Sequence, residues 1–396
     1  MLKKTVAVVL TAAVLLLLLT GCWDKKELNE LAIVTAFGID RDKATGRVDL
    51  ALQVIRPSAL NRQQGGSQEA PYQVIETSGR NIVEAIRKAN MKLDRRLCFS
   101  HLAVIVAGEQ AARYGLNGLI DYILRTHEVR QEVWLSVTRD KVSRILSVKN
   151  GIENIQASYM EGIIETQHEF LNVTAADVKS FIDKLPGAGV NPVTGMFSIH
   201  NEESISAPNN QPVRKEGLIF SGTAAFRKDK LIGFLNNQET RGLNYLINAQ
   251  KGGHILVRGL ENKQSYITIE LKNVTCQIDP TFSNGKPTFN IRVNAEGNIS
   301  QVDDASNVAD PKELEKVNRE FAASIRQDIR STITRSQKTL KTDILGFGRA
   351  YEEEYPARWK KIKNQWTTYF PDQSVKVIVK TNIKQTGLLL NPLQTN

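Results

Sequence analysis

Cysteine is scarce in this chain, whose 396 residues include three, at positions 22, 98 and 276. So few cysteines exclude the disulfide framework that holds many small secreted domains together. Cys98 and Cys276 lie far apart in strand-like, apolar stretches, a setting typical of small buried thiols. A single bridge between these two cysteines is the alternative.

The residues that usually carry catalysis are also sparse or badly spaced. Five histidines are scattered along the chain, and His168-Glu169 lacks the second histidine that a helical zinc-protease motif requires three residues later. No Gly-x-Ser-x-Gly sequence is present, and no glycine-rich loop carries the lysine of a phosphate-binding loop. We therefore predict a protein that is not an enzyme and that needs no metal or cofactor.

Basic residues exceed acidic ones, 52 against 42, which gives a formal net charge of +10. No run of four or more lysines and arginines occurs, so the charge is that of a mixed, solvated surface. Nucleic acid is therefore not an expected partner. The alternative reading of the basic excess is attraction to an anionic membrane face.

One long apolar run is present, and it lies near the start of the chain. Lys3 and Lys4 precede an uncharged stretch at 6–19, which Leu19-Thr20-Gly21-Cys22 closes. A basic start, an apolar run and small residues before a cysteine are typical of a lipoprotein signal. We predict that residues 1–21 are a signal peptide and that Cys22 becomes the lipidated first residue of the mature chain.

The predicted modification is a diacylglyceryl group on the Cys22 thiol, with N-palmitoylation of the same residue left open. Two acyl chains give a stable membrane anchor, whereas one chain binds only marginally. The alternatives are an uncleaved transmembrane helix, for which the apolar run is short, and ordinary secretory cleavage. Later apolar runs, such as 102–107, have the length of strands, so the rest is predicted to be an exported, lipid-tethered soluble body.

Strand and helix patterns alternate in the first half. Segments 32–39 and 48–55 predict a β-hairpin, because Val48, Leu50, Leu52 and Val54 share one face. Further strands are predicted at 72–77, 101–107 and 132–138, and helices at 80–93, 109–124, 141–148, 153–167 and 175–185, the last capped by Thr174. Such alternation predicts a mixed sheet covered by helices.

Residues 201–216 contain two prolines and almost no apolar side chains, and they are predicted to be a linker. Strands are predicted beyond it at 217–226, 231–235, 255–258, 265–278, 288–299 and 375–381, with a short helix at 240–248. A long helix is predicted from Pro311 and another after Pro356. The second helix carries Trp359, Trp366 and Phe370 on one stripe, a pattern typical of a core.

These patterns predict a multi-domain α+β protein. Residues 22–200 are expected to form a mixed α/β domain, divisible into two subdomains. Residues 217–396 are expected to form a mostly antiparallel sheet packed on long helices.

The residues around the first cysteine resemble the start of a known family. Residues 21–30, which read Gly-Cys-Trp-Asp-Lys-Lys-Glu-Leu-Asn-Glu, are similar to the opening of the Ger(x)C family, the lipoprotein C subunits of spore germinant receptors. Further matching segments are Gly38-Ile39-Asp40, the strand 100–106, Arg125 with Glu128 and Arg130, the pair of strands 222–235 with Arg241-Gly242-Leu243 as an Arg-Gly turn, residues 343–348, and Pro356, Trp359 and Trp366. The resemblance covers essentially the whole mature chain.

This resemblance implies a peripheral lipoprotein on the outer face of the spore inner membrane. In the family, the C subunit belongs to a complex with two integral-membrane subunits, of A and B type, which senses nutrient germinants. No catalytic residues are assigned to the family, and known members have mixed α/β domains. The function implied is therefore assembly or signalling of the receptor during germination.

Four residues are candidates for a partner-facing surface, namely Arg241, Gly242, His101 and Arg125. For each of them, a structural role at a turn or strand edge is the alternative. A lipid-anchored solute-binding protein that captures the germinant itself is the second functional class. Such a protein should place a ligand cleft between two similar α/β lobes, and the strand-rich second half does not repeat the first.

Overall fold

The first two strands of the computed structural model form the hairpin that the apolar alternation predicts. β1 (Leu31–Arg41) pairs antiparallel with β2 (Val48–Ile55). The structure describes residues 30–56, 70–148, 153–168, 171–205, 212–249, 252–262, 264–283, 286–304 and 306–385, together with Thr5. Cys22 and, apart from Thr5, the predicted signal peptide lie outside the described residues.

Strands from both sides of the predicted linker form one sheet. Its described strands follow the order β10-β9-β8-β6-β5-β1-β2-β3, with β4 beside β1 and β7 beside β6. The neighbours β1, β5, β6 and β8 pair in parallel, whereas strands toward both edges pair antiparallel. The added strands are β3 (Tyr72–Gly79), β4 (Arg96–Cys98), β5 (Val104–Gly108), β6 (Trp134–Thr138), β7 (Ala176–Asp177), β8 (Val193–Ile205), β9 (Pro212–Arg227) and β10 (Lys230–Leu235). The predicted mixed sheet is confirmed.

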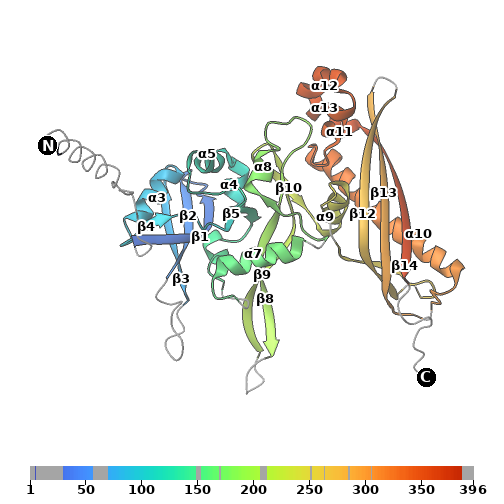
Figure 1. Ribbon diagram of the computed structural model, residues 1–396, viewed down its shortest axis with the longest axis horizontal. Coiled ribbons are helices and arrows are strands. Elements are labelled where there is room, and N and C mark those ends of the chain that lie inside the picture. Colours follow the sequence, from blue (N-terminus) through green and yellow to red (C-terminus); the bar gives the residue numbers. More distant parts are fainter. Residues whose placement is uncertain are drawn as a thin grey trace.

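Helices cover both faces of this sheet, so neighbouring residues of one strand enter two separate cores (Figure 1). Leu50 and Leu52 of β2 pack in the core under α3, α4 and α5, whereas Ala51 faces the core under α6 and α7. The helices are α3 (Ile82–Asn90), α4 (Glu109–Tyr114), α5 (Asn117–Arg125), α6 (Val142–Ile145) and α7 (Gln156–His168). The single helix predicted at 109–124 is divided, because Gly115 has a φ of +127° and ends α4.

The structure differs from the predicted linker at 201–216. β8 and β9 pair from Val193 and Ala225 outward to Ile205 and Pro212, so 201–205 and 212–216 are the far part of a hairpin. Figure 1 shows that this hairpin projects away from the rest of the sheet. Backbone hydrogen bonds hold such a projection together without a large apolar core, so its polar composition resembles that of a linker. Residues 217–235 then complete the first sheet.

The helix predicted at 175–185 is shorter and has a different cap. α8 (Val178–Ile182) follows β7 directly, and the Asp177 carboxylate accepts the Ser180 N–H at 2.6 Å. The predicted cap, Thr174, is buried and instead donates its hydroxyl to Asn244 Oδ1 at 2.8 Å. Asp177 outcompetes Thr174 because a carboxylate is a stronger acceptor at a helix start.

The second sheet follows the order β11-β12-β13-β14 and has four strands within the described residues. Its strands are β11 (His254–Arg258), β12 (Tyr266–Ser283), β13 (Lys286–Val302) and β14 (Ser374–Gln385). The first three pair antiparallel, and β14 joins β13 in parallel after the chain returns through its helices. The mostly antiparallel second half is therefore confirmed.

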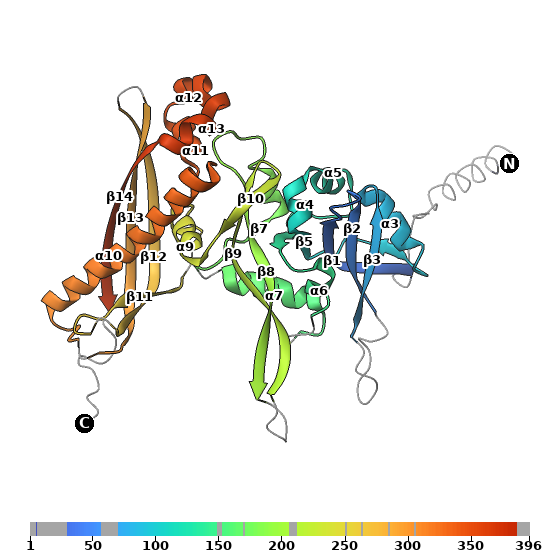
Figure 2. The ribbon, with the colours of Figure 1, turned by 180° about the vertical axis from the view of Figure 1, so that it is seen from behind.

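The helix α10 (Pro311–Thr334) crosses one face of the second sheet (Figure 2). It begins at Pro311, and the Asp310 side chain accepts the Lys312 N–H at 2.7 Å, as the helix-start signals predict. Its apolar residues Phe321, Ile325 and Ile329 form one stripe and are fully buried in the core that the helix shares with the strands. The stripe, repeated every fourth residue, therefore provides the core of this half.

The helix predicted after Pro356 is a series of short turns. These are α12 (Pro356–Ile362), η3 (Lys363–Gln365), α13 (Trp366–Tyr369) and η4 (Phe370–Asp372), with α11 (Phe347–Glu354) before them. Trp359, Trp366 and Phe370 are buried together, so the interpretation of the aromatic stripe as core is confirmed. Phe289 of β13 stacks on Phe347 with ring centroids 4.5 Å apart, which ties these turns to the sheet.

Candidate functional site

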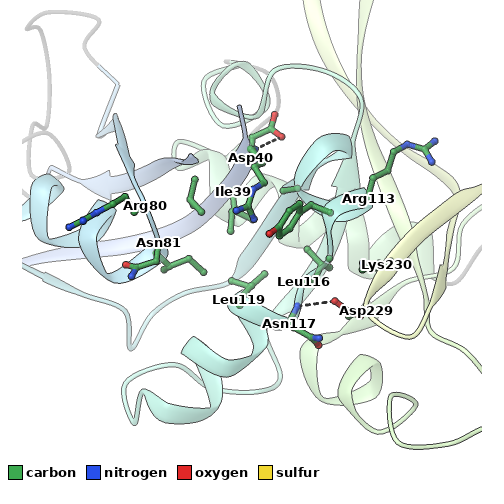
Figure 3. A pocket seen from close by; sticks show the side chains of 17 residues that line it. Ile39, Asp40, Arg80, Asn81, Arg113, Leu116, Asn117, Leu119, Asp229 and Lys230 are labelled. Atoms are coloured by element: carbon green, nitrogen blue, oxygen red, sulfur yellow. Dashed lines mark hydrogen bonds between the residues drawn. The ribbon is translucent and has the colours of Figure 1, made fainter. Parts of the chain in front are cut away.

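A cavity of about 710 Å³ opens where four parts of the first half meet (Figure 3). The end of β1 provides Ile39, Asp40 and Arg41, and the start of α3 lies on the opposite side. The junction of α4 and α5 and the turn between β9 and β10 complete the wall. The site therefore depends on parallel neighbours in the sheet and on the edge strand β10.

Asp40 is the half-buried acid of this cavity. Its Oδ1 accepts the backbone N–H of Arg41 at 2.8 Å. Burial raises the pKa of Asp40, against the lowering effect of the backbone N–H groups of Arg41 and Ala111. The carboxylate fits because residue 108 is glycine, where a Cβ atom would come within 2.3 Å of the Asp40 carboxyl carbon.

Basic side chains surround the cavity, but they differ in the contacts that they make with other groups of the chain. The Arg41 guanidinium lies 3.3 Å from the centroid of the Tyr114 ring, and its Nε is buried without a hydrogen-bond partner among the described residues. Arg80, which precedes α3, and Arg113 of α4 form ion pairs with Glu84 and Glu109. Arg41 is therefore the cation best placed to receive an acceptor from outside the chain.

Asp229, in the turn between β9 and β10, holds the junction of α4 and α5 in place. Asp229 accepts the Leu116 N–H on its backbone oxygen at 3.0 Å and the Asn117 N–H on its carboxylate at 3.3 Å. A Cβ atom at Gly115 would lie 2.4 Å from that carboxylate, so glycine is needed there for space as well as for its positive φ. These contacts fix the edge strand β10 against the helices.

The cavity can bind a small polar or anionic ligand, but its chemistry ends there. The described lining contains Arg41, Arg80, Arg113 and Lys230 with Asp40 and Asp229, and no serine, threonine, cysteine or histidine. A hydroxyl or thiol nucleophile of serine, threonine or cysteine, with a histidine as its base, is therefore missing from these described walls. Within the described ranges, no three His, Cys, Asp or Glu side chains gather in an arrangement suited to a metal ion.

Two of the predicted partner-contact residues, Arg241 and Gly242, lie inside the contact between two helices. They belong to α9 (Asn237–Leu246), so the segment compared with an Arg-Gly turn is helical. Arg241 donates from Nε and Nη2 to the two carboxylate oxygens of Asp328 on α10, at 2.9 and 3.1 Å. Burial raises the pKa of Asp328, and the guanidinium of Arg241 lowers it.

Gly242 lets α9 approach α10 closely. A Cβ atom at this position would lie 2.2 Å from Thr332 Oγ1 and 2.3 Å from the backbone oxygen of Asp328. Both residues thus have internal contacts that the fold requires. Their contact with a partner stays a prediction, and the 30% exposure of the Arg241 side chain leaves part of it accessible.

The other two predicted residues lie on the first sheet, away from α9. His101 is exposed in the loop that precedes β5. Arg125 is exposed at the end of α5 and forms an ion pair with Asp121 one turn earlier, at 2.8 Å. The four candidates therefore belong to two separate parts of the molecule, and partner contact at His101 and Arg125 stays a prediction.

Asp343 is buried, and its carboxylate forms a polar centre that the patterns in the sequence do not predict. Its two carboxylate oxygens accept four backbone N–H groups and the indole N–H of Trp366. Burial raises its pKa to about 6, while these donors lower it. Its backbone oxygen also accepts the Asn191 N–H at 2.8 Å, so the same residue joins the second half to the first. Residues 343–348 are one of the segments that resemble the family, but their sequence does not indicate that Asp343 is buried.

The two described cysteines are both free, so the alternative of a bridge between Cys98 and Cys276 is not realised. Burial raises the pKa of the Cys276 thiol to about 12, which makes it unreactive. Within the described part of the chain, no helix has both the length and the apolar composition that a membrane crossing requires.

Comparison with known proteins identifies the family. The model described as "Spore germination protein N-terminal domain" matches residues 24–199, and "Spore germination B3/ GerAC like, C-terminal" matches residues 221–387. Spore germination protein KC of Bacillus subtilis (strain 168) is 30% identical, with 96% of this chain and 97% of the relative covered. This chain belongs to the Ger(x)C family of spore germination proteins.

A second relative and a solved structure are also similar to this chain. The putative spore germination protein YfkR of Bacillus subtilis (strain 168) is 26% identical, with 98% of both chains covered. The crystal structure of the GerBC protein is similar to this chain with a TM-score of 0.51 at 18% identity, over 88% of this chain and 96% of that one. The predicted family and the predicted multi-domain α+β fold are confirmed.

Proposed function

We propose that this chain is the lipid-anchored, non-enzymatic subunit of a spore nutrient germinant receptor. It is held on the outer face of the spore inner membrane and acts in assembly or signalling of the receptor with two integral-membrane subunits. The observation that carries the proposal is the pair of spore germination family models, which together match residues 24–199 and 221–387. Both halves of the chain therefore belong to one germination protein.

The anchor is proposed to be Cys22, with a diacylglyceryl group on its thiol. The sequence Leu19-Thr20-Gly21-Cys22 closes the apolar run, and the first family match begins at residue 24, two residues later. The matched domain would thus begin almost directly at the membrane. Two acyl chains on one residue suffice for stable anchoring.

A role through contact fits the arrangement of side chains better than catalysis does. The described lining of the cavity beside Arg41 has no serine, threonine, cysteine or histidine, and the buried polar centre at Asp343 is occupied by the chain's own N–H groups. The solvent-facing side of the second sheet, where alternate residues of β13 and β14 are exposed, remains for association with other subunits. Function then depends on which surfaces the fold presents and on where the anchor holds them.

A solute-binding protein is the alternative, and the cavity beside Arg41 is the observation that favours it. That class places its ligand between two similar lobes. Here the described strands of the two sheets differ in number and order, and the residues that line the cavity belong to the first sheet and the helices beside it. The geometry therefore supports the receptor subunit better.

Co-purification tests the proposal directly. We expect the tagged full-length chain, captured from detergent-solubilised spore membranes, to bring down two polytopic membrane proteins in comparable amounts. A tagged spore lipoprotein from another family, captured in the same detergent, serves as the control and should bring down neither. Recovery of the chain alone, from spores that germinate on the nutrient, would refute the receptor assignment.

A further inference from the structure

We infer that one end of the first sheet is a docking surface for an anionic phospholipid bilayer. This basic end is made of Val83, Arg87 and Met91, which lie on or just after α3, and of Arg95 and Arg96, which lead into β4. The inference rests on the proposed lipid anchor at Cys22 and adds to it an orientation of the body on the membrane.

Charge is the first observation. Residues 80–96 contain six basic and two acidic residues, a surplus of four in a chain whose formal net charge is +10. Glu84 is already engaged with Arg80 and Lys88 at 2.8 and 3.0 Å. Arg87 and Arg96 are exposed, and no described residue forms a salt bridge with either of them. These cations are therefore available to phosphate groups.

Exposed apolar side chains are the second observation. Met91 is 82% exposed and Val83 is 62% exposed, although each could have been polar at no cost to the core. Val83, Arg87 and Met91 are spaced by four residues, so they form one stripe on the outer side of α3, opposite the buried Ile82 and Ala85. Exposed apolar side chains beside cations can insert below the headgroups while the cations contact lipid phosphate.

The position of the tether is the third observation. β4 pairs in parallel with the start of β1, with Arg96 opposite Leu31. The N–H of Leu97 donates to Asn90 Oδ1 at 3.0 Å, which holds the end of α3 against β4. Leu31 is the ninth residue after Cys22, so even a fully extended connection keeps the anchor within about 35 Å of Arg96. The basic end is thus forced to stay near the bilayer.

Other exposed basic residues are differently placed. Arg292 and Lys384 on the second sheet are paired with Asp279 and Glu296, at 2.8 and 2.7 Å. That sheet lies at the far end of the molecule from α3 and β4 (Figure 1). Docking through the basic end would direct the second sheet away from the membrane.

The test uses the full-length, lipidated chain in reconstituted vesicles. An environment-sensitive fluorophore is attached at Met91→Cys, in a background that carries Cys98→Ser and Cys276→Ser, while lipidation protects Cys22. The control site is Leu256→Cys on β11, where the leucine is 59% exposed. Vesicles contain either phosphatidylglycerol mixed with phosphatidylcholine or phosphatidylcholine alone.

We expect the fluorophore at position 91 to report an apolar environment on the anionic vesicles only, and to be quenched by spin-labelled lipid. High salt should reverse the change, and the probe at position 256 should not respond. Replacing Arg87, Arg95 and Arg96 with glutamine should weaken docking about fivefold for each charge removed. A matched triple replacement of the exposed Arg258, Lys376 and Lys380 should leave docking unchanged.

Two outcomes would overturn the inference. A probe at position 91 that stays in water on anionic vesicles would leave this end free for a protein partner. An equal response to both triple replacements would show general attraction of a basic protein. Failure of the anchor itself looks different, because the chain would then not remain with the vesicles at all.

Discussion

Replacement of Asp343 by alanine should lower the free energy of unfolding by about 3 to 5 kcal/mol, because it leaves several buried N–H groups without an acceptor. Asp343 is 2% exposed. The backbone donors to its carboxylate are Leu345, Gly346, Phe347 and Gly348, at 2.7 to 3.2 Å. The Trp366 indole N–H adds a fifth bond at 2.9 Å. Chemical denaturation followed by tryptophan fluorescence measures the loss.

Asparagine at position 343 should not rescue the stability. In asparagine, an NH₂ group would replace one carboxylate oxygen and would face N–H donors. The described groups that hydrogen-bond to the carboxylate all donate to it. Glu353→Ala on α11, the helix that follows Asp343, is the control, because Glu353 is 68% exposed and pairs with Arg349. That control should change stability by less than about 0.5 kcal/mol. An asparagine variant as stable as the parent would contradict the role assigned to this carboxylate.

Replacement of Gly242 by alanine should destabilise the chain by about 2 to 3 kcal/mol, even though alanine is the better helix former. The added Cβ atom would lie 2.2 Å from Thr332 Oγ1 and 2.3 Å from the Asp328 backbone oxygen. A backbone atom cannot move aside as a flexible side chain can, so α9 must withdraw from α10. The bidentate bond from Arg241 to Asp328 would lengthen with it.

A second helical glycine provides the matched control. Gly162 lies in α7, and a Cβ atom there would meet nothing within 4 Å. Gly162→Ala should therefore stabilise the chain by about 0.5 to 1 kcal/mol, through helix propensity alone. Thermal unfolding of both variants separates the two effects. If Gly242→Ala were also stabilising, the close approach of α9 and α10 would not be a feature of the folded protein.

Much of the fold could be predicted from local patterns. The hairpin of β1 and β2, the strands of the second sheet and the apolar stripe of α10 follow from periods of two and of nearly four residues. Amino-acid composition predicted the structure less well where backbone pairing alone stabilises it, as in the hairpin of β8 and β9. Nothing local showed that β8, β9 and β10 continue the first sheet, since sheet order depends on distant contacts.

The candidate sites were predicted less well, for a physical reason. Arg241 and Asp343 both carry charge, and a charged residue in a sequence suggests a solvated surface. Each is instead paired with groups far along the chain, Arg241 with Asp328 and Asp343 with Trp366. The cavity beside Asp40 and Arg41 also combines residues from β1, from two helices and from the turn at Asp229. Such sites exist only once the tertiary structure brings these segments together.

We propose that this Ger(x)C protein works by contact while lipid holds it at the membrane. Cys22 is the residue that the claim needs most, since lipidation is the one covalent step it includes. Cys276 offers a matched control, because it is also a cysteine but free and partly buried.

Cys22→Ala in the full-length chain, with Cys276→Ala beside it, is the most direct test. The amounts of chain in the spore membrane fraction and the rate of nutrient-triggered germination are measured on the same spores. We predict that Cys22→Ala leaves an exported chain that is unprocessed or released from the membrane, with slowed germination, whereas Cys276→Ala stays membrane-bound and germinates normally. Normal membrane retention together with normal germination in the Cys22→Ala spores would contradict the account.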